Sequence, residues 1–148
     1  MGTMGGEASI VVQAPIDEVY ALLADVASAP EWQSGLKEMR VLDRDAQGRP
    51  QQCETLSDAK VRTIKTVLRF RYEPGVAVRW EQVKGDLKAL AGAWELRDLG
   101  DASTHVTYRL DVDPGRVLGL LVRGPVEDRM REIMVDARPG ELAARLAR

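Results

Sequence analysis

The segment from Arg62 to Tyr72 alternates between two kinds of residue more regularly than any other part of the chain. Such alternation is typical of a β-strand with one face in the core and one face in water. The face expected to point inward carries Ile64, Thr66, Leu68, Phe70 and Tyr72, and the other face carries Thr63, Lys65, Val67, Arg69 and Arg71. The turn Glu73-Pro74-Gly75 follows, so the next strand is expected to fold back beside this one.

Other short segments are also expected to form strands, from alternation, from a β-branched run or as the returning strand of a hairpin, and turn residues separate them. Before this strand come Ile10 to Val12, Met39 to Val41 and Gln51 to Ser57, and after it come Val76 to Trp80, Leu90 to Leu96 and Val106 to Val112. Strands that are joined by tight turns pair antiparallel. Gly92 stands at a position suited to a bulge or a sharp bend.

Two short helices are expected between the first and second strands. Pro15 suits the first turn of a helix. Apolar residues follow it at helical spacing, namely Val19, Leu22, Leu23 and Val26. Asp25 is a candidate N-cap for a second short helix that ends near Trp32.

A long helix is expected to close the chain. It begins at Pro125, and its apolar stripe comprises Val126, Met130, Ile133, Met134 and Ala137. Pro139 and Gly140 interrupt this pattern, because proline has no N–H to donate and glycine weakens a helix. The sequence leaves open whether the helix continues through Pro139.

Together these elements predict an α+β domain, in which antiparallel strands and helices are segregated along the chain. Residues 1–6 are rich in glycine and are expected to form a flexible N-terminus. Residues 7–148 are expected to form a single domain.

The composition argues against several classes of protein. The chain has 148 residues and a net charge of -2 at pH 7, so it lacks the positive charge typical of nucleic-acid-binding domains. Cys53 is the only cysteine and His105 the only histidine, so neither a disulfide framework nor a zinc site is expected. No apolar run approaches the ~20 residues that span a bilayer. We therefore expect a cytoplasmic protein that needs no cofactor.

A further pattern runs through the first strand and the short helices: Ala14-Pro15, Val19-Tyr20, Leu23, Asp25-Val26 and Pro30-Glu31-Trp32. It continues through Gly92 to Leu96, Ser103 to Tyr108 and the final helix. The pattern resembles the helix-grip superfamily (SRPBCC), which includes START-like, Bet v 1-like and polyketide cyclase/dehydrase proteins. The resemblance covers the chain after Gly6. It implies a curved seven-stranded sheet that grips the last helix, with a deep, mostly apolar cavity between them.

The residues expected to line this cavity come from the inward strand faces, the end of the short helices and the last helix. They are Trp32, Met39, Cys53, Ile64, Thr66, Leu68, Phe70, Tyr72, Trp80, Leu90, Trp94, Tyr108, Leu110, Met130, Ile133 and Met134. Each of them could instead fill a dry core, and Trp32 could be either an entrance residue or a plug. The chain has a single Phe, and methionine adapts to exchangeable contents, so the set as a whole favours a cavity.

Groups suited to catalysis are scarce. His105 alternates with Val106 and Tyr108, so it is expected to face away from the cavity. In the aromatase/cyclases of this superfamily, the strand that matches Arg62 to Phe70 carries an inward Arg and Trp, which orient a poly-β-keto chain. Leu68 and Ile64 stand at those positions here. The polar groups that could orient a ligand, or act as general acids, are Thr66, Tyr72 and Tyr108.

These features favour a protein that binds or transports a hydrophobic small molecule, such as a lipid, polyketide or isoprenoid, without catalysis. The alternative is a polyketide cyclase/dehydrase that uses the cavity hydroxyls as general acids. A third interpretation is a protein-interaction module or toxin-like regulator with a vestigial cavity. The expected partner is a hydrophobic ligand, without nucleic acid or stable membrane insertion, and the oligomeric state stays open.

Overall fold

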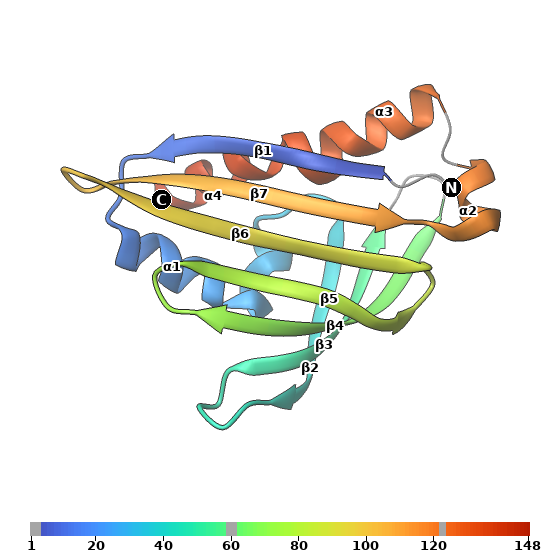
Figure 1. The fold of residues 1–148 in the computed structure, drawn as a ribbon, viewed down its shortest axis with the longest axis horizontal. Coiled ribbons are helices and arrows are strands. Elements are labelled where there is room, and N and C mark those ends of the chain that lie inside the picture. The colour runs from blue at the N-terminus through green and yellow to red at the C-terminus, as the bar shows by residue number, and fades with distance from the viewer. Residues whose placement is uncertain (1–3, 59–61, 122–123) are drawn as a thin grey trace.

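The fold is built on one antiparallel sheet of seven strands. The computed structural model describes residues 4–58, 62–121 and 124–148. The strands are β1 (Met4–Val12), β2 (Leu36–Arg44), β3 (Pro50–Asp58), β4 (Thr63–Glu73), β5 (Ala77–Gly85), β6 (Ala89–Gly100) and β7 (Ser103–Asp113). They are ordered β1-β7-β6-β5-β4-β3-β2 across the sheet (Figure 1). The predicted α+β class and the consecutive antiparallel pairing are confirmed.

Two short helices connect β1 to β2, as predicted: α1 (Ile16–Ala24) and the 3₁₀ helix η1 (Val26–Glu31). Asp25, the candidate N-cap of the second helix, makes no capping hydrogen bond through its side chain. Its backbone carbonyl instead accepts hydrogen bonds from the N–H of Ser28, at 3.0 Å, and from the hydroxyl of Ser28, at 2.8 Å. The prediction of an Asp25 side-chain cap is therefore wrong, because the backbone of this residue begins the helix.

The first strand begins at Met4, so the expected flexible N-terminus of six residues is wrong from that point on. Met4 is buried and pairs with Val112 of β7. A Cβ atom at Gly5 would collide with the carbonyl oxygen of Leu110, so only glycine fits this close approach to β7. The glycine that suggested disorder in the sequence allows tight pairing in the structure. Residues 1–3 lie outside the described residues.

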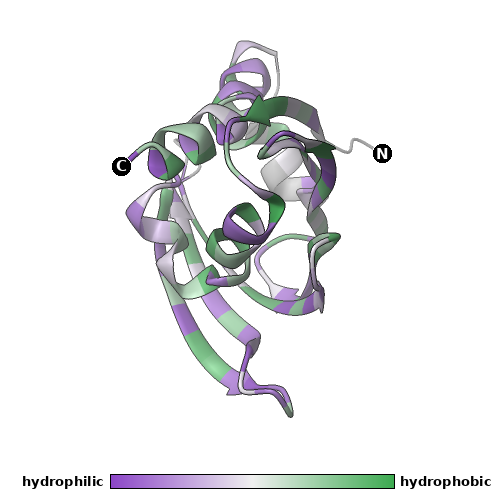
Figure 2. Ribbon diagram, turned by 90° about the vertical axis from the view of Figure 1, so that its left-hand side faces the viewer, coloured by the Kyte–Doolittle hydropathy of each residue, from purple (hydrophilic) through white to green (hydrophobic). Residues whose placement is uncertain are grey.

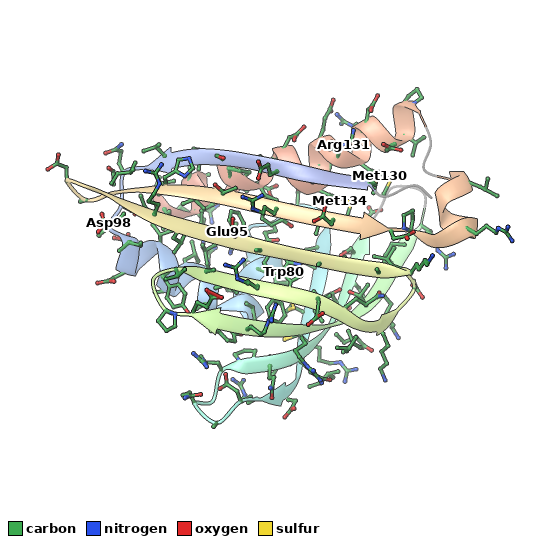
Figure 3. The ribbon with its side chains drawn as sticks, in the orientation of Figure 1. Trp80, Glu95, Asp98, Met130, Arg131 and Met134 are labelled. Carbon is green, nitrogen blue, oxygen red and sulfur yellow. The ribbon has the colours of Figure 1, made fainter. Side chains whose placement is uncertain are left out.

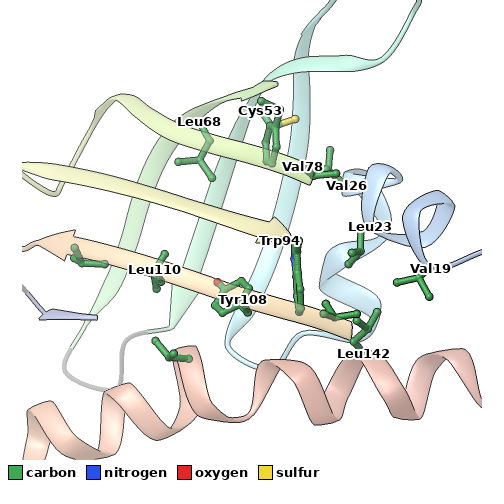
Figure 4. Close-up of a cluster of buried hydrophobic side chains, with 14 of the residues drawn as sticks. Val19, Leu23, Val26, Cys53, Leu68, Val78, Trp94, Tyr108, Leu110 and Leu142 are labelled. Atoms are coloured by element: carbon green, nitrogen blue, oxygen red, sulfur yellow. The ribbon is translucent and has the colours of Figure 1, made fainter. Parts of the chain in front are cut away.

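Four helical segments follow β7: α2 (Gly115–Leu121), α3 (Pro125–Arg131), the π-helix η2 (Glu132–Asp136) and α4 (Arg138–Leu146). The helix predicted from Pro125 corresponds to the last three, and α2 is additional to it. Pro125 occupies the first turn of α3, where a backbone N–H would have no partner within the helix. The ribbon from α3 to α4 runs unbroken along the concave side of the sheet (Figure 4).

The π-helix explains how the chain continues through Pro139. The N–H of Ala137 donates to the carbonyl of Glu132, five residues earlier, at 2.9 Å. This wider turn ends one regular hydrogen-bond ladder, and Pro139 then lies in the first turn of the next helix, α4. Proline is tolerated at that position because its N–H would have no partner there.

Hydrophilic and hydrophobic residues alternate along the strands, so the sheet has one apolar and one polar face (Figure 2). The apolar face is concave and packs against the helices. Val19 and Leu23 of α1 and Leu142 of α4 are buried against it (Figure 4). Among the helices that the structure describes, none is long and apolar enough to cross a membrane.

Candidate functional site

A pocket lies between the concave face of the sheet and the helices. The space open to the centre of a water-sized sphere is about 120 Å³. The wall is mainly apolar and comes from all seven strands, from α1 and η1, and from the C-terminal helices. The pocket is smaller than the roughly 300–1,000 Å³ of typical ligand sites, so it fits a compact molecule without rearrangement.

Most of the residues predicted to line a cavity do lie on this wall. They are Trp32, Met39, Ile64, Thr66, Leu68, Phe70, Trp80, Leu90, Trp94, Tyr108, Leu110, Met130 and Met134. Cys53, Tyr72 and Ile133 were also predicted but are not part of the wall. Each of these three has a different physical reason.

Cys53 is fully buried and belongs to the same hydrophobic core as Val78 and Val26 (Figure 4). Burial raises the pKa of its thiol to about 11. The thiol is therefore protonated at neutral pH and packs as a small apolar group.

Tyr72 is half-buried, and its hydroxyl donates a hydrogen bond to the backbone carbonyl of Pro50. The guanidinium of Arg49 lies 4.8 Å from the centre of its ring. Burial raises the pKa of the phenol. Tyr72 therefore holds β4 to the β2–β3 turn, and the role predicted for it, to orient a ligand, does not fit this geometry.

Ile133 lies beside the loop at Gly35, because the π-helix changes which side of the helix faces the sheet. In a regular helix, positions three and four apart share a face. The wider turn between 132 and 136 keeps residues four apart aligned and moves those three apart off the shared face, so Met130, Met134 and Arg138 reach the pocket and Ile133 does not. Arg138 was not predicted because the stripe was assigned from apolar residues, and this charged residue stands next to Pro139, where the apolar pattern is interrupted.

An uninterrupted row of five aromatic rings forms one side of the pocket. The row runs Trp32, Trp94, Tyr108, Trp80 and Phe70, with successive ring centres 6.0, 4.6, 5.8 and 6.0 Å apart. Trp32 follows η1 directly, so its contact with Trp94 fixes the short helices to the sheet. The rings are tilted against one another at distances that favour aromatic contacts.

Gly92 makes space for this row. It pairs with Trp80 across the β5–β6 ladder, and a Cβ atom there would lie 2.5 Å from the indole ring. The pairing has no register shift at this position. Of the two alternatives predicted at Gly92, the bulge is therefore wrong, and the glycine is needed because a large ring crosses it.

Few polar groups interrupt the apolar wall. The hydroxyls of Thr55 and Thr66 form a buried hydrogen bond of 2.6 Å with each other, which satisfies one donor of the pair. Thr66 was predicted to orient a ligand, but Thr55 was not predicted. No alternation signal distinguished Thr55, since its strand was recognised only as the returning strand of a hairpin.

Arg138 is the one strongly charged group that reaches the wall from the described part of the last helix. It is 6% exposed. Its Nη1 atom donates to the carbonyl of Ser34 and to Glu141 Oε1, both at 2.8 Å. Burial raises the pKa of the neighbouring Tyr108, and the Arg138 charge partly opposes that rise.

His105 lies opposite Val11 and Arg97 in the β7 ladders, on the strand face away from the pocket. Val106 and Tyr108, which alternate with it along the strand, are buried, as the pattern predicts. Within residues 4–58, 62–121 and 124–148, no three His, Cys, Asp or Glu side chains gather as they would around a metal ion.

Solved structures with the same fold come from several bacteria. A START superfamily protein from Mycobacterium smegmatis has a TM-score of 0.83 and 19% identity, over 99% of this chain and 98% of that one. A protein from Thermus thermophilus has a TM-score of 0.80 and 18% identity, over 99% of this chain and 97% of that one. An aromatase/cyclase from Streptomyces sp. R1128 has a TM-score of 0.74 and 17% identity, over 99% of this chain and 95% of that one. At these identities the likeness establishes the helix-grip fold alone.

The sequence of the chain matches a known protein family. No curated protein matches the chain. Residues 12–137, however, match the family described as polyketide cyclase / dehydrase and lipid transport. That match runs from the end of β1 to the π-helix and so includes nearly all of the pocket wall. The chain therefore belongs to the polyketide cyclase / dehydrase and lipid transport family.

Proposed function

We propose that this protein binds a hydrophobic small molecule in the pocket between the sheet and the C-terminal helices. The observation that carries the proposal is the apolar wall with its row of five aromatic rings. Removing apolar surface from water contributes about 25 cal/mol per Å², before the cost of ordering the ligand. The few polar groups on the wall set the orientation.

The family and the size of the pocket narrow the ligand. The family description includes lipid transport, and lipids, polyketides and isoprenoids all offer the apolar surface that this wall requires. A volume of about 120 Å³ favours a compact, ring-sized molecule or part of a longer one. Met130 and Met134 on the helix side are flexible enough to adapt to a larger ligand.

The test combines native mass spectrometry of the purified protein with binding of the dye ANS. We expect a co-purified apolar molecule, and ANS binding that Leu68→Arg abolishes, because an unpaired charge would stand in the apolar pocket. Leu42→Arg, at an exposed position of β2, is the matched control and should leave dye binding unchanged. Circular dichroism verifies that both variants fold.

A second variant keeps this test decisive if Leu68→Arg does not fold. Leu68→Phe adds volume without charge and should weaken ANS binding in a folded protein. ANS binding of equal strength in the wild type, Leu68→Phe and Leu42→Arg, together with no bound molecule in the mass spectrum, would contradict the proposal.

A polyketide cyclase/dehydrase activity is the second candidate, and the contact between Tyr108 and Arg138 favours it. Of the three hydroxyls proposed as general acids, Tyr72 is bonded to Pro50 and Thr66 to Thr55, so Tyr108 is the best placed. Incubation with a short poly-β-ketone followed by liquid chromatography and mass spectrometry separates the two functions. A binding protein returns the compound unchanged, and an enzyme that uses Tyr108 loses turnover in Tyr108→Phe.

A further inference from the structure

Two hydrogen-bond donors on the pocket wall are buried and have no partner among the described residues. They are Nε1 of Trp32 and Nε of Arg138. Buried donors are almost always satisfied in folded proteins, because an unmade hydrogen bond costs free energy. Two such atoms beside one pocket indicate that its ligand supplies an acceptor.

Both donors lie beside the half of the aromatic row that Trp32, Trp94 and Tyr108 form. Arg138 donates to the carbonyl of Ser34, only two residues beyond Trp32 in the chain. The ring of Trp32 packs on Trp94, which packs on Tyr108, and Tyr108 lies next to Arg138. The polar part of the pocket wall is therefore formed where the short helices, β6, β7 and α4 meet.

The guanidinium of Arg138 is fixed in place before any ligand binds. Its Nη1 atom holds two acceptors, the carbonyl of Ser34 and the carboxylate of Glu141. The Nε–H makes no hydrogen bond to a described residue, so this donor of the planar group is left for a ligand. Glu141 also balances the Arg138 charge, since their side chains are 7% and 19% exposed and form a close ion pair.

We propose that the ligand carries an uncharged carbonyl oxygen, which accepts hydrogen bonds from Trp32 Nε1–H and Arg138 Nε–H. This inference rests on the proposed function of the pocket. A carbonyl oxygen has two lone pairs and therefore suits two donors. A carboxylate suits the site less well, because it would add a buried negative charge where Glu141 already neutralises Arg138. The apolar remainder of the ligand lies along the aromatic row.

Three small molecules of nearly equal shape test this inference: ethylbenzene, acetophenone and benzoate. Their affinities are measured by ¹H–¹⁵N NMR, which also reports on the indole and Arg Nε–H groups. We expect acetophenone to bind about fivefold more tightly than ethylbenzene, as for one to two added hydrogen bonds. Benzoate should bind most weakly. The Trp32 indole proton should shift downfield with acetophenone and not with ethylbenzene.

Matched variants identify the donors. Trp32→Phe keeps an aromatic ring and removes the N–H, so it should abolish the preference for acetophenone over ethylbenzene, measured as the ratio of the two affinities in the same variant. Trp80→Phe makes the same change elsewhere on the wall and should keep the preference. Arg138→Lys retains the charge without an Nε–H and should also lose the preference, which gives a second readout if Trp32→Phe does not fold.

The outcomes separate this inference from the proposed function. If ethylbenzene and acetophenone bind equally and the variants do not differ, the pocket binds apolar molecules but the carbonyl inference is overturned. If benzoate binds most tightly, the argument from the Glu141 charge is overturned. If none of the three molecules binds, the proposed function and this inference both fail.

Discussion

The two faces of the sheet are made by the same strands but are stabilised in different ways. On the concave face, Tyr108 and Leu110 of β7 are buried against the helices. On the convex face of the same strand, Arg109 forms ion pairs with Glu7 of β1 and with Glu95 of β6. Figure 3 labels Glu95 on this face. Within β7, one face is therefore stabilised by packing and the other by ion pairs at the surface.

The charges on the convex face form a continuous ladder from β1 to β4 across the sheet. It runs Glu7–Arg109–Glu95–Arg79–Glu73, with closest N–O distances of 2.7, 2.6, 2.9 and 2.9 Å. Hydrogen bonds from Arg109 and then from Arg79 lower the pKa of Glu95. The side chains of the ladder are 31–53% exposed, so water and salt screen each pair.

We expect most of the free energy of unfolding to come from the concave face. A buried aromatic ring stabilises the folded state through packing that water cannot replace. An exposed ion pair adds only about 0–1 kcal/mol to the free energy of unfolding. The concave face should therefore tolerate little change, and the convex face should tolerate much more.

The largest effect is expected for Trp94→Ala on the concave face. Trp94 is 3% exposed and contacts both Trp32 and Tyr108, so its removal leaves a cavity in the middle of the aromatic row. The free energy of unfolding should fall by about 3–5 kcal/mol, measured by urea denaturation. Trp94→Phe is the control and should cost less. A loss below about 1 kcal/mol would show that the row is not tightly packed.

An intermediate effect distinguishes two neighbours on the π-helix. Val135 is 1% exposed, so Val135→Ala should lower the free energy of unfolding by about 2 kcal/mol. Ile133 is only partly buried, so Ile133→Ala should cost about 1 kcal/mol although it removes more carbon atoms. The reverse order, measured by urea denaturation, would mean that Ile133 faces the core as a regular helix predicts.

A smaller effect, with a distinctive pH dependence, is expected for Glu95→Gln on the convex face. Because the pKa of Glu95 is lowered in the folded state, its carboxylate stabilises the fold above the ordinary pKa of glutamate. This contribution is lost as the pH falls through the lowered folded-state pKa. At neutral pH the variant should lose at most about 1 kcal/mol, and less at high salt.

The measurement for Glu95→Gln is urea denaturation at pH 7 and at pH 3, each with and without 1 M salt. The difference between wild type and variant should shrink at the lower pH and at high salt. A difference that persists under all four conditions would show that Glu95 acts through packing rather than charge.

The strand faces could be predicted from the sequence, because a period of two residues assigns each side chain to one side. This rule placed Trp80, Trp94 and Tyr108 on the inward face, and the resemblance to the helix-grip superfamily predicted that this face lines a cavity. Cys53 and Tyr72 share the inward face with the pocket residues, but residue alternation does not tell where along the strand the pocket ends. Cys53 therefore lies in the core, and Tyr72 is bonded to Pro50 at the β2–β3 turn.

The last helix was less predictable, because a π-turn breaks the 3.6-residue period on which its stripe was assigned. Ile133 was expected on the wall and the wider turn accounts for that error, whereas Arg138 was not expected because the stripe was assigned from apolar residues alone. Pro139 was the only local signal, since a proline inside a helix requires a change in the hydrogen-bond ladder. It indicated that the helix is irregular without indicating which side chains then reach the pocket.

The smallest effect is expected for His105→Ala. His105 lies on the convex face, between Val106 and Thr104, whose side chains are buried on the opposite side. An imidazole on that face cannot reach a ligand in the pocket, since the sheet itself stands between them. The free energy of unfolding should therefore change by less than about 0.5 kcal/mol, as for ordinary surface substitutions, and ANS or acetophenone binding should be unchanged. Urea denaturation and the NMR titration measure the two quantities. A tenfold loss of binding in this variant would mean that β7 does not keep its register, and the assignment of the whole pocket wall would then be wrong.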